Sequence, residues 1–163
     1  MIEKLNLLRS INQLTIFKLG NHSNQEVDRL RRNIRYNSIS YLWKIQFYGD
    51  AQDIADLVNV QYGKVICISF SSAGGIGEEN DEQIRNGLYH INNFIREQHV
   101  GRYFRQPSFQ PLPLLARMTE EQMEEEGALE EMEAQMNNNG YYGTIKDTAN
   151  NAKVETLNHF IQW

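Results

Sequence analysis

Cysteine is almost absent from this chain of 163 residues, and proline is scarce. The single cysteine, Cys67, excludes an internal disulfide and a cysteine-based zinc cluster, and it favours a reducing compartment. We therefore expect the protein inside the cell, in the cytoplasm, the nucleus or a large cytoplasmic assembly. No run approaches the roughly 18 apolar residues that a membrane helix needs, so the sequence predicts no membrane insertion.

A strong excess of positive charge is also missing. The chain has 16 lysines and arginines against 21 aspartates and glutamates, which gives a net charge of −5 and a pI near 5.4. This balance argues against attraction of the whole surface to nucleic acid or to anionic lipid. Because 40% of the residues are hydrophobic, as in ordinary globular proteins, the sequence predicts one folded domain over residues 1–163.

Catalytic and metal-binding patterns are absent as well. The four histidines are scattered without the spacing of metal ligands: His22, His90, His99 and His159. Cys67 lies in an apolar run, where a thiol is usually inert. Residues 71–77 are rich in glycine but lack the lysine that completes a phosphate-binding loop, so they predict a helix end and a turn. We expect no enzyme activity, no cofactor and no metal.

Repeated signals for helix starts are present. Capping boxes at residues 23–26, 80–83 and 119–122 predict three helix starts, Asp50 predicts a fourth, and Gly49 predicts a helix end. Apolar residues follow these boxes at helical spacing, in three stripes: Val27, Leu30, Ile34, Tyr41 and Ile45; then Ile84, Leu88, Ile91 and Ile95; then Leu129, Met132 and Met136.

One segment does not follow the helical pattern. Residues 65–70 are rich in β-branched side chains and would, in isolation, be interpreted as a strand. No second convincing strand exists to pair with it, so we interpret it as a buried helix. All three prolines lie in residues 105–115, which cannot form one continuous helix, and we expect a long loop over residues 103–113. The sequence therefore predicts an all-α protein.

The order of these elements resembles the carboxy-terminal armadillo repeats of importin-α. Residues 123–136, with an acidic lead, Gly127 and Leu129, are similar to the family's last repeat, and residues 84–91 resemble a helix of the repeat before it. The resemblance implies a short armadillo-type α-solenoid of about three repeats with irregular insertions, in units 1–49, 50–102 and 114–163. The corresponding positions Val27, Ile84 and Ile145 lie 57 and 61 residues apart, which exceeds the roughly 40–47 residues of regular repeats.

The resemblance also suggests binding residues. The family holds an extended peptide on tryptophans and asparagines four residues apart, and its groove acids receive the lysines of the cargo. At this spacing Trp43 is followed by Phe47, and Asn86 is followed by His90, so the pattern is incomplete. These four residues are candidates for protein or peptide binding. Simple packing is the alternative for each, because aromatic residues on amphipathic helices and lone histidines are more often packing residues.

Two charged clusters complete the candidates. Four arginines occupy two helical turns, and guanidinium groups suit bidentate capture of carboxylates: Arg29, Arg31, Arg32 and Arg35. We include Arg29 and Arg32 in the candidate site, although a solvated helix face is the simpler interpretation and an acidic partner the second. Eight glutamates between residues 120 and 133 could attract a basic segment, but they too are typical of a solvated face.

Two functions remain open at this stage. The first is a non-enzymatic protein–protein interaction module linked to nuclear transport or peptide binding, with transport factors as partners. The alternative is a structural or accessory subunit built permanently into a large multiprotein assembly, without a cargo-binding role. Since a short solenoid leaves apolar ends, we also expect residues 5–18 to form a helix that covers Leu30 and Ile34.

Overall fold

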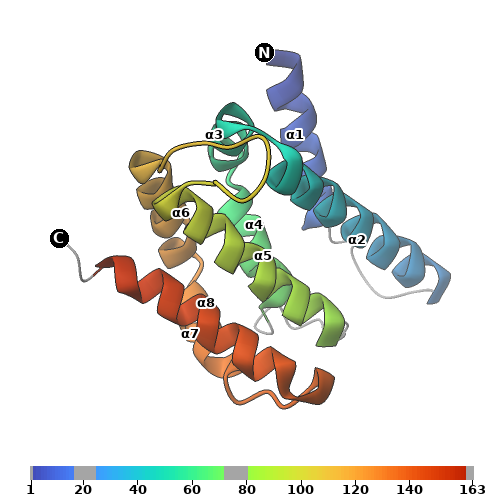
Figure 1. The fold of residues 1–163 in the computed structure, drawn as a ribbon. Coiled ribbons are helices and arrows are strands. Elements are labelled where there is room, and N and C mark those ends of the chain that lie inside the picture. Colours follow the sequence, from blue (N-terminus) through green and yellow to red (C-terminus); the bar gives the residue numbers. More distant parts are fainter. Residues whose placement is uncertain (1, 17–24, 72–80, 161–163) are drawn as a thin grey trace.

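The computed structural model describes residues 2–16, 25–71 and 81–160. Within these residues the chain forms eight α-helices and no strand, so the prediction of an all-α protein is confirmed (Figure 1). The helices are α1 (Ile2–Thr15), α2 (Gln25–Tyr48), α3 (Ala51–Asn59), α4 (Tyr62–Phe70), α5 (Asp81–Val100), α6 (Pro113–Glu125), α7 (Ala128–Gln135) and α8 (Thr144–Phe160), with the short 3-10 helix η2 (Tyr141–Gly143) before the last.

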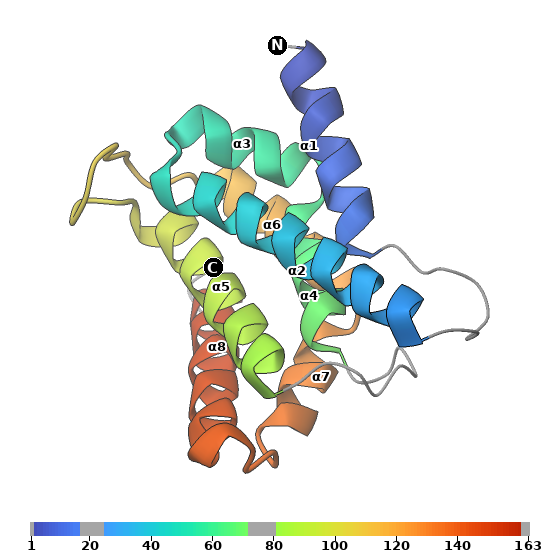
Figure 2. The same ribbon diagram turned by 90° about the vertical axis from the view of Figure 1, so that its right-hand side faces the viewer.

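The long helices α2, α5 and α8 run in the same direction, one beside the next (Figures 1 and 2). α5 occupies the middle and packs against α4, α6 and α8. It buries Leu88, Ile91 and Ile95 completely, as the sequence stripe predicts for this helix. At Gly87 an added Cβ would lie 3.0 Å from the Ser69 Oγ atom, so α4 and α5 approach each other closely because this residue has no side chain.

Residues 65–70 belong to α4, and the prediction of a buried helix is confirmed. Val65, Ile66, Cys67 and Phe70 are all buried. α4 contacts α1, α3, α5 and α6, so it is enclosed on several sides. This enclosure explains why the segment is apolar throughout and resembles a strand in sequence.

Two predicted helix starts have different outcomes. At Asp50 a full capping box is present, since the Oδ1 atom accepts from the amide of Asp53 at 3.0 Å and Asp53 Oδ2 accepts from the amide of Asp50 at 2.9 Å. The prediction of a start at residues 119–122 is wrong. Thr119 lies inside α6, which begins at Pro113, and its hydroxyl donates to Gln98 Oε1 at 2.9 Å. Proline at the first helical position provides the actual start signal.

The other two boxes begin outside the described residues, because Ser23 and Asn80 lie there. The helices that follow them, α2 and α5, begin at Gln25 and Asp81.

The apolar stripe of α2 is covered only in part, since Ile45 packs against the core but three other members are exposed. Leu30, Ile34 and Tyr41 are 49%, 39% and 50% exposed, so the prediction that residues 5–18 cover Leu30 and Ile34 is wrong. α1 does pack on α2, but it contacts another face, where Arg35 Nε donates to the carbonyl oxygen of Thr15.

The buried face of α2 is mostly polar. Its buried residues are Arg31, Ser38, Leu42 and Gln46. Arg31, Leu42 and Gln46 each follow a residue of the apolar stripe by one position, and Ser38 lies on the same face, four positions before Leu42. One residue corresponds to a rotation of about 100° around a helix. The neighbours of α2 therefore cover a different face from the one that apolar spacing indicates.

Candidate binding cleft

A cleft of about 310 Å³ opens between α2 and α5. Most of its lining residues come from these two helices. Thr15, the last residue of α1, and Ser69, near the end of α4, line it as well. The two helices run side by side without close backbone packing along this stretch (Figure 2). We call this space the binding cleft.

The lining of the binding cleft is cationic and aromatic. Three arginines line it, Arg32, Arg35 and Arg85, and no aspartate or glutamate is among the described lining residues. Tyr36 and Tyr89 add aromatic rings. Guanidinium groups next to aromatic rings can bind a carboxylate or phosphate together with an apolar group.

Four of the six candidate residues from the sequence line this cleft: Arg32, Trp43, Asn86 and His90. The two incomplete Trp/Asn steps thus come from helices that face each other. Phe47 is not a lining residue, but its ring lies 5.4 Å from that of Trp43. Arg29 lies elsewhere on α2 and donates from Nε to Glu26 Oε2 at 3.1 Å.

Sequence reasoning missed Arg85 and Tyr89, which are four residues apart on α5 and both line the cleft. The available signal was their position: Arg85 precedes Asn86 and Tyr89 precedes His90. Arg85 and Tyr89, at a spacing of four, share one helix face, and that face lies next to the face of Asn86 and His90.

His90 is both a packing residue and a wall of the cleft. Its ring centroid lies 5.1 Å from that of Trp43. Burial lowers the pKa of His90 to about 4, so the imidazole is neutral at neutral pH. Among the described residues, its Nδ1 atom has no hydrogen-bond partner. His90 therefore contributes an uncharged imidazole to the cleft wall, and the positive charge of the lining comes from the three arginines.

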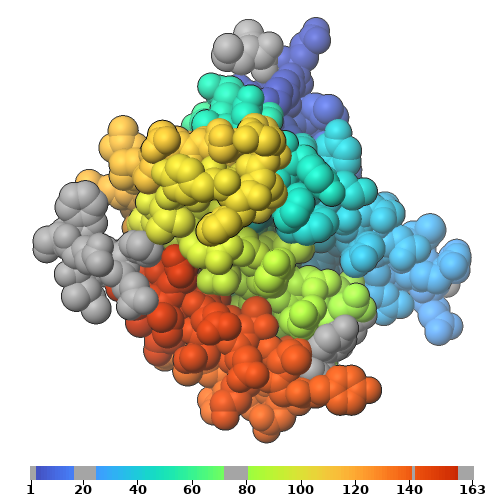
Figure 3. All heavy atoms as spheres, viewed as in Figure 1, coloured from blue at the N-terminus to red at the C-terminus, as the bar shows by residue number. Residues whose placement is uncertain are grey.

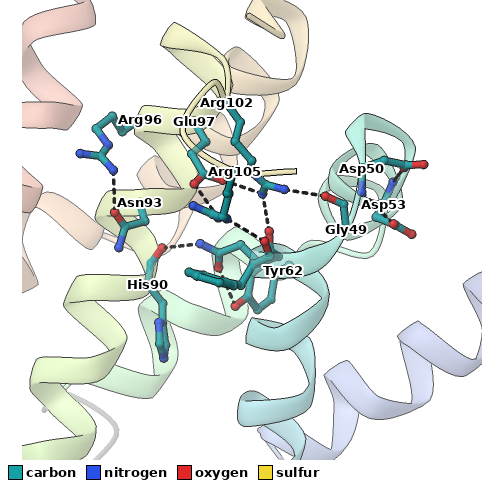
Figure 4. Close-up of polar contacts among 12 residues, drawn as sticks. Gly49, Asp50, Asp53, Tyr62, His90, Asn93, Arg96, Glu97, Arg102 and Arg105 are labelled. Carbon is teal, nitrogen blue, oxygen red and sulfur yellow. Dashed lines mark hydrogen bonds and ion pairs between the residues drawn. The ribbon is translucent and has the colours of Figure 1, made fainter. Parts of the chain in front are cut away.

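Hydrogen bonds join α2 and α5 at one end of the cleft (Figure 4). Gln46 Nε2 of α2 donates to the carbonyl oxygen of His90 at 3.2 Å, and Gln46 Oε1 accepts from the hydroxyl of Tyr62 at 3.0 Å. Beyond α5, Arg102 donates to the carbonyl oxygens of Gln46 and Gly49, the latter at 2.6 Å. These carbonyl groups lie at the end of α2, where intrahelical donors run out.

Glu97, Arg102 and Arg105 form what we call the arginine clamp. Arg102 is 1% exposed, and its Nη2 atom lies 2.7 Å from Glu97 Oε2. Arg105 pairs with the other oxygen of Glu97 at 2.7 Å, and its Nε atom donates to the carbonyl oxygen of Phe47 at 2.9 Å. Arg102 and Arg105 also place two positive charges at the carboxyl end of α2, where they interact favourably with the negative end of the helix dipole. The clamp fixes the position of this end relative to α5.

Several glutamates of the acidic run pair within the molecule. Lys64 lies 2.5 Å from Glu126, Lys153 lies 2.6 Å from Glu133, and His99 lies 2.7 Å from Glu120. The pairs of Lys153 and His99 each join two helices, and Lys64 of α4 pairs with the residue directly after α6. These carboxylates therefore hold α6 and α7 against their neighbours as well as facing solvent.

No family model, curated protein or solved structure matches this chain. In residues 2–16, 25–71 and 81–160, no three histidine, cysteine, aspartate or glutamate side chains group closely enough to hold a metal ion. None of the described helices is both long and apolar enough to cross a membrane. The chain is thus defined by its fold and its cleft: an all-helical protein with a cationic cleft between two long helices.

Proposed function

We propose that the chain is a non-enzymatic protein-interaction module whose binding cleft takes an acidic segment of a partner protein. The observation that carries this proposal is the charge of the lining, which has three arginines and no carboxylate among its described residues. Guanidinium groups bind carboxylates with paired hydrogen bonds. A cleft lined by one sign of charge also concentrates its field and attracts ligands of the opposite sign.

An armadillo-type solenoid of about three repeats is part of the proposal. Helix lengths support it: α3 and α4 have nine residues each before the 20-residue α5, and α6 and α7 have 13 and eight before the 17-residue α8. α1 and α2 then form an incomplete first unit. In this arrangement the cleft lies between the long helices of the first and second units, where the importin-α family binds extended peptides.

The charge of the cleft differs from that of importin-α, whose acids receive lysines. A lysine-rich nuclear localisation signal would meet Arg32, Arg35 and Arg85 and be repelled. We therefore propose an acidic partner for the cleft, and weak or undetectable binding of lysine-rich cargo.

Fluorescence anisotropy with two labelled peptides tests this function. A hexaglutamate peptide should bind the full chain, and a hexalysine peptide should not. Arg85→Gln should weaken hexaglutamate binding about tenfold, which corresponds to about 1.4 kcal/mol, because it removes one charge-assisted contact. Arg29→Gln is the matched control, since Arg29 lies outside the cleft. Tighter binding of hexalysine, or equal losses in both variants, would contradict the proposal.

A specific observation also favours the second candidate, a permanently bound structural subunit. Exposed apolar side chains lie on α1 and α2, the outer pair of the proposed solenoid: Leu7, Leu14, Leu30, Ile34 and Tyr41. An uncovered terminal unit of a repeat array needs a cap or a partner. Fractionation of the native protein by size separates the two candidates. A subunit should elute in a stoichiometric complex, whereas an interaction module should elute as a free chain.

A further inference from the structure

Aromatic rings continue beyond the binding cleft in one connected row. Ring centroids lie 6.0 Å apart for Tyr89 and His90, 5.1 Å for His90 and Trp43, 5.4 Å for Trp43 and Phe47, and 4.9 Å for Phe47 and Tyr48. We call these five residues the aromatic row. Tyr89 at one end is 48% exposed and Tyr48 at the other is 66% exposed, and the three residues between them are half-buried. The row is therefore a surface feature that connects the cleft with the end of α2.

The arginine clamp holds the far end of this row. The guanidinium carbon of Arg105 lies 3.9 Å from the centroid of the Phe47 ring. Residues 101–112 connect α5 to α6 and lie on the surface next to the end of α2 (Figure 3). Paired backbone hydrogen bonds of 2.8 and 3.0 Å between Arg102 and Phe109 fix the loop. Phe104 on this loop is 92% exposed.

An exposed aromatic surface that is already fixed suits peptide recognition. Little side-chain freedom remains to be lost at Trp43 and Phe47, so the ordering cost of binding is small. Rows of aromatic side chains are typical of grooves that bind proline-rich segments, because such segments are extended before they bind. At the cleft end, Arg32, Arg35 and Arg85 add positive charge, whereas Arg105 at the other end is paired with Glu97.

We propose that the aromatic row extends the binding cleft, and that the occupant is one extended partner segment, acidic at one end and rich in proline and leucine at the other. The acidic end lies against Arg32, Arg35 and Arg85, and the apolar end lies along the rings toward Tyr48. This inference rests on the proposed function of the cleft and adds the length, polarity and composition of its ligand.

The dimensions of α2 set the length of this segment. From Arg32 to Tyr48 the chain advances 16 residues, which is about 24 Å of helix at 1.5 Å per residue. An extended chain covers this distance with about seven residues at roughly 3.4 Å each. A peptide of seven to nine residues therefore reaches both parts of the surface.

Three labelled peptides of equal length test the extension by anisotropy on the full chain. The first has four glutamates followed by alternating proline and leucine. The second has the same glutamates followed by alternating glycine and serine, and the third has glycine and serine followed by the proline–leucine half. We expect the first to bind about tenfold more tightly than the second, since stacking and burial on the rings add to the charge contacts. The third should bind most weakly.

The Tyr48→Ala variant tests the aromatic row independently of the binding cleft. Tyr48 lies outside the cleft lining and is largely exposed, so its truncation leaves the core intact. The variant should lose several-fold affinity for the first peptide and none for the second. Tyr142→Ala is the matched control, because Tyr142 is an exposed tyrosine that belongs to neither the cleft nor the row.

The outcomes distinguish the extension from the function it rests on. Equal affinity for the first two peptides, or an equal effect of Tyr48→Ala on both, overturns the extension and leaves acid binding by the cleft in place. If neither glutamate peptide binds, the proposed function fails and the extension fails with it.

Discussion

The two helices on either side of the cleft are stabilised in opposite ways. α5 lies in the middle of the molecule and buries apolar side chains such as Leu88, Ile91 and Phe94. α2 lies at the edge, leaves Leu30 and Ile34 of its apolar stripe exposed, and buries polar residues such as Gln46. The comparison shows that α5 is held mainly by buried apolar area, whereas the end of α2 is held by specific hydrogen bonds. The cleft therefore has one wall held by apolar packing, and one wall held by the arginine clamp at its carboxyl end and by α1 along the rest.

The largest expected effect comes from the core face of α5. Phe94 is fully buried and packs edge-on against Tyr62, with ring centroids 5.1 Å apart. Phe94→Ala should lower the free energy of unfolding by about 3–5 kcal/mol, because it removes contacts and leaves a cavity. Ile34→Ala on the exposed stripe of α2 should change it by less than about 0.5 kcal/mol. Urea denaturation of both variants measures the difference, and equal losses would contradict the comparison.

An intermediate effect is expected at the polar contact of α2. Gln46→Ala leaves the buried Tyr62 hydroxyl and the His90 carbonyl group without their partner. The expected loss is about 1–3 kcal/mol, because a buried polar group without a hydrogen bond keeps its full desolvation cost. Asn37→Ala, on the exposed face of the same helix, is the control and should change stability by less than about 0.5 kcal/mol. A Gln46→Ala protein as stable as the control would show that α2 does not depend on these bonds.

The smallest effect is a dependence on pH at the boundary between the helices. Burial lowers the pKa of His90 from 6.5 to about 4. Between these values the unfolded chain binds a proton that the folded protein does not, so stability falls as the pH falls through this window. From about pH 7.5 to about pH 5 the loss should be about 1–2 kcal/mol. Denaturation midpoints of the original protein and of His90→Asn, each measured at about pH 7.5 and about pH 5, test this. The variant should lose less stability between the two pH values, and an equal loss would exclude His90 as the source of the pH dependence.

Helical periodicity predicted α5 better than α2 for a physical reason. Spacing identifies a helix and its apolar stripe, and in α5 other helices cover that stripe. In α2 the stripe is present in the sequence, but the neighbours cover the face that carries Gln46 and Ser38. Which face is covered depends on tertiary contacts, and one helix's sequence does not contain them. The false start at Thr119 has a different cause, because the signal that begins this helix, Pro113, is present in the sequence six residues earlier.

The candidate site could be predicted only in part. Four-residue spacing identified Trp43 and His90 on separate helices, and the structure brings their rings together. The arginine clamp has no comparable signal, since nothing in the sequence relates Arg102 to the carbonyl groups of Gln46 and Gly49 more than 50 positions away. Bonds from side chains to distant backbone groups become visible only when the chain is folded.

The arginine clamp holds only one of the two halves of α2. In the other half α1 packs on the helix and Arg35 Nε donates to the carbonyl oxygen of Thr15, although Leu30 in the first turns stays exposed. Arg32 and Arg35 lie on this half, whereas Trp43 and Phe47 lie next to the clamp. Two parts of the chain that are far apart in sequence thus position the two halves of α2: Thr15 of α1 holds the arginine half, and the loop after α5 holds the aromatic half.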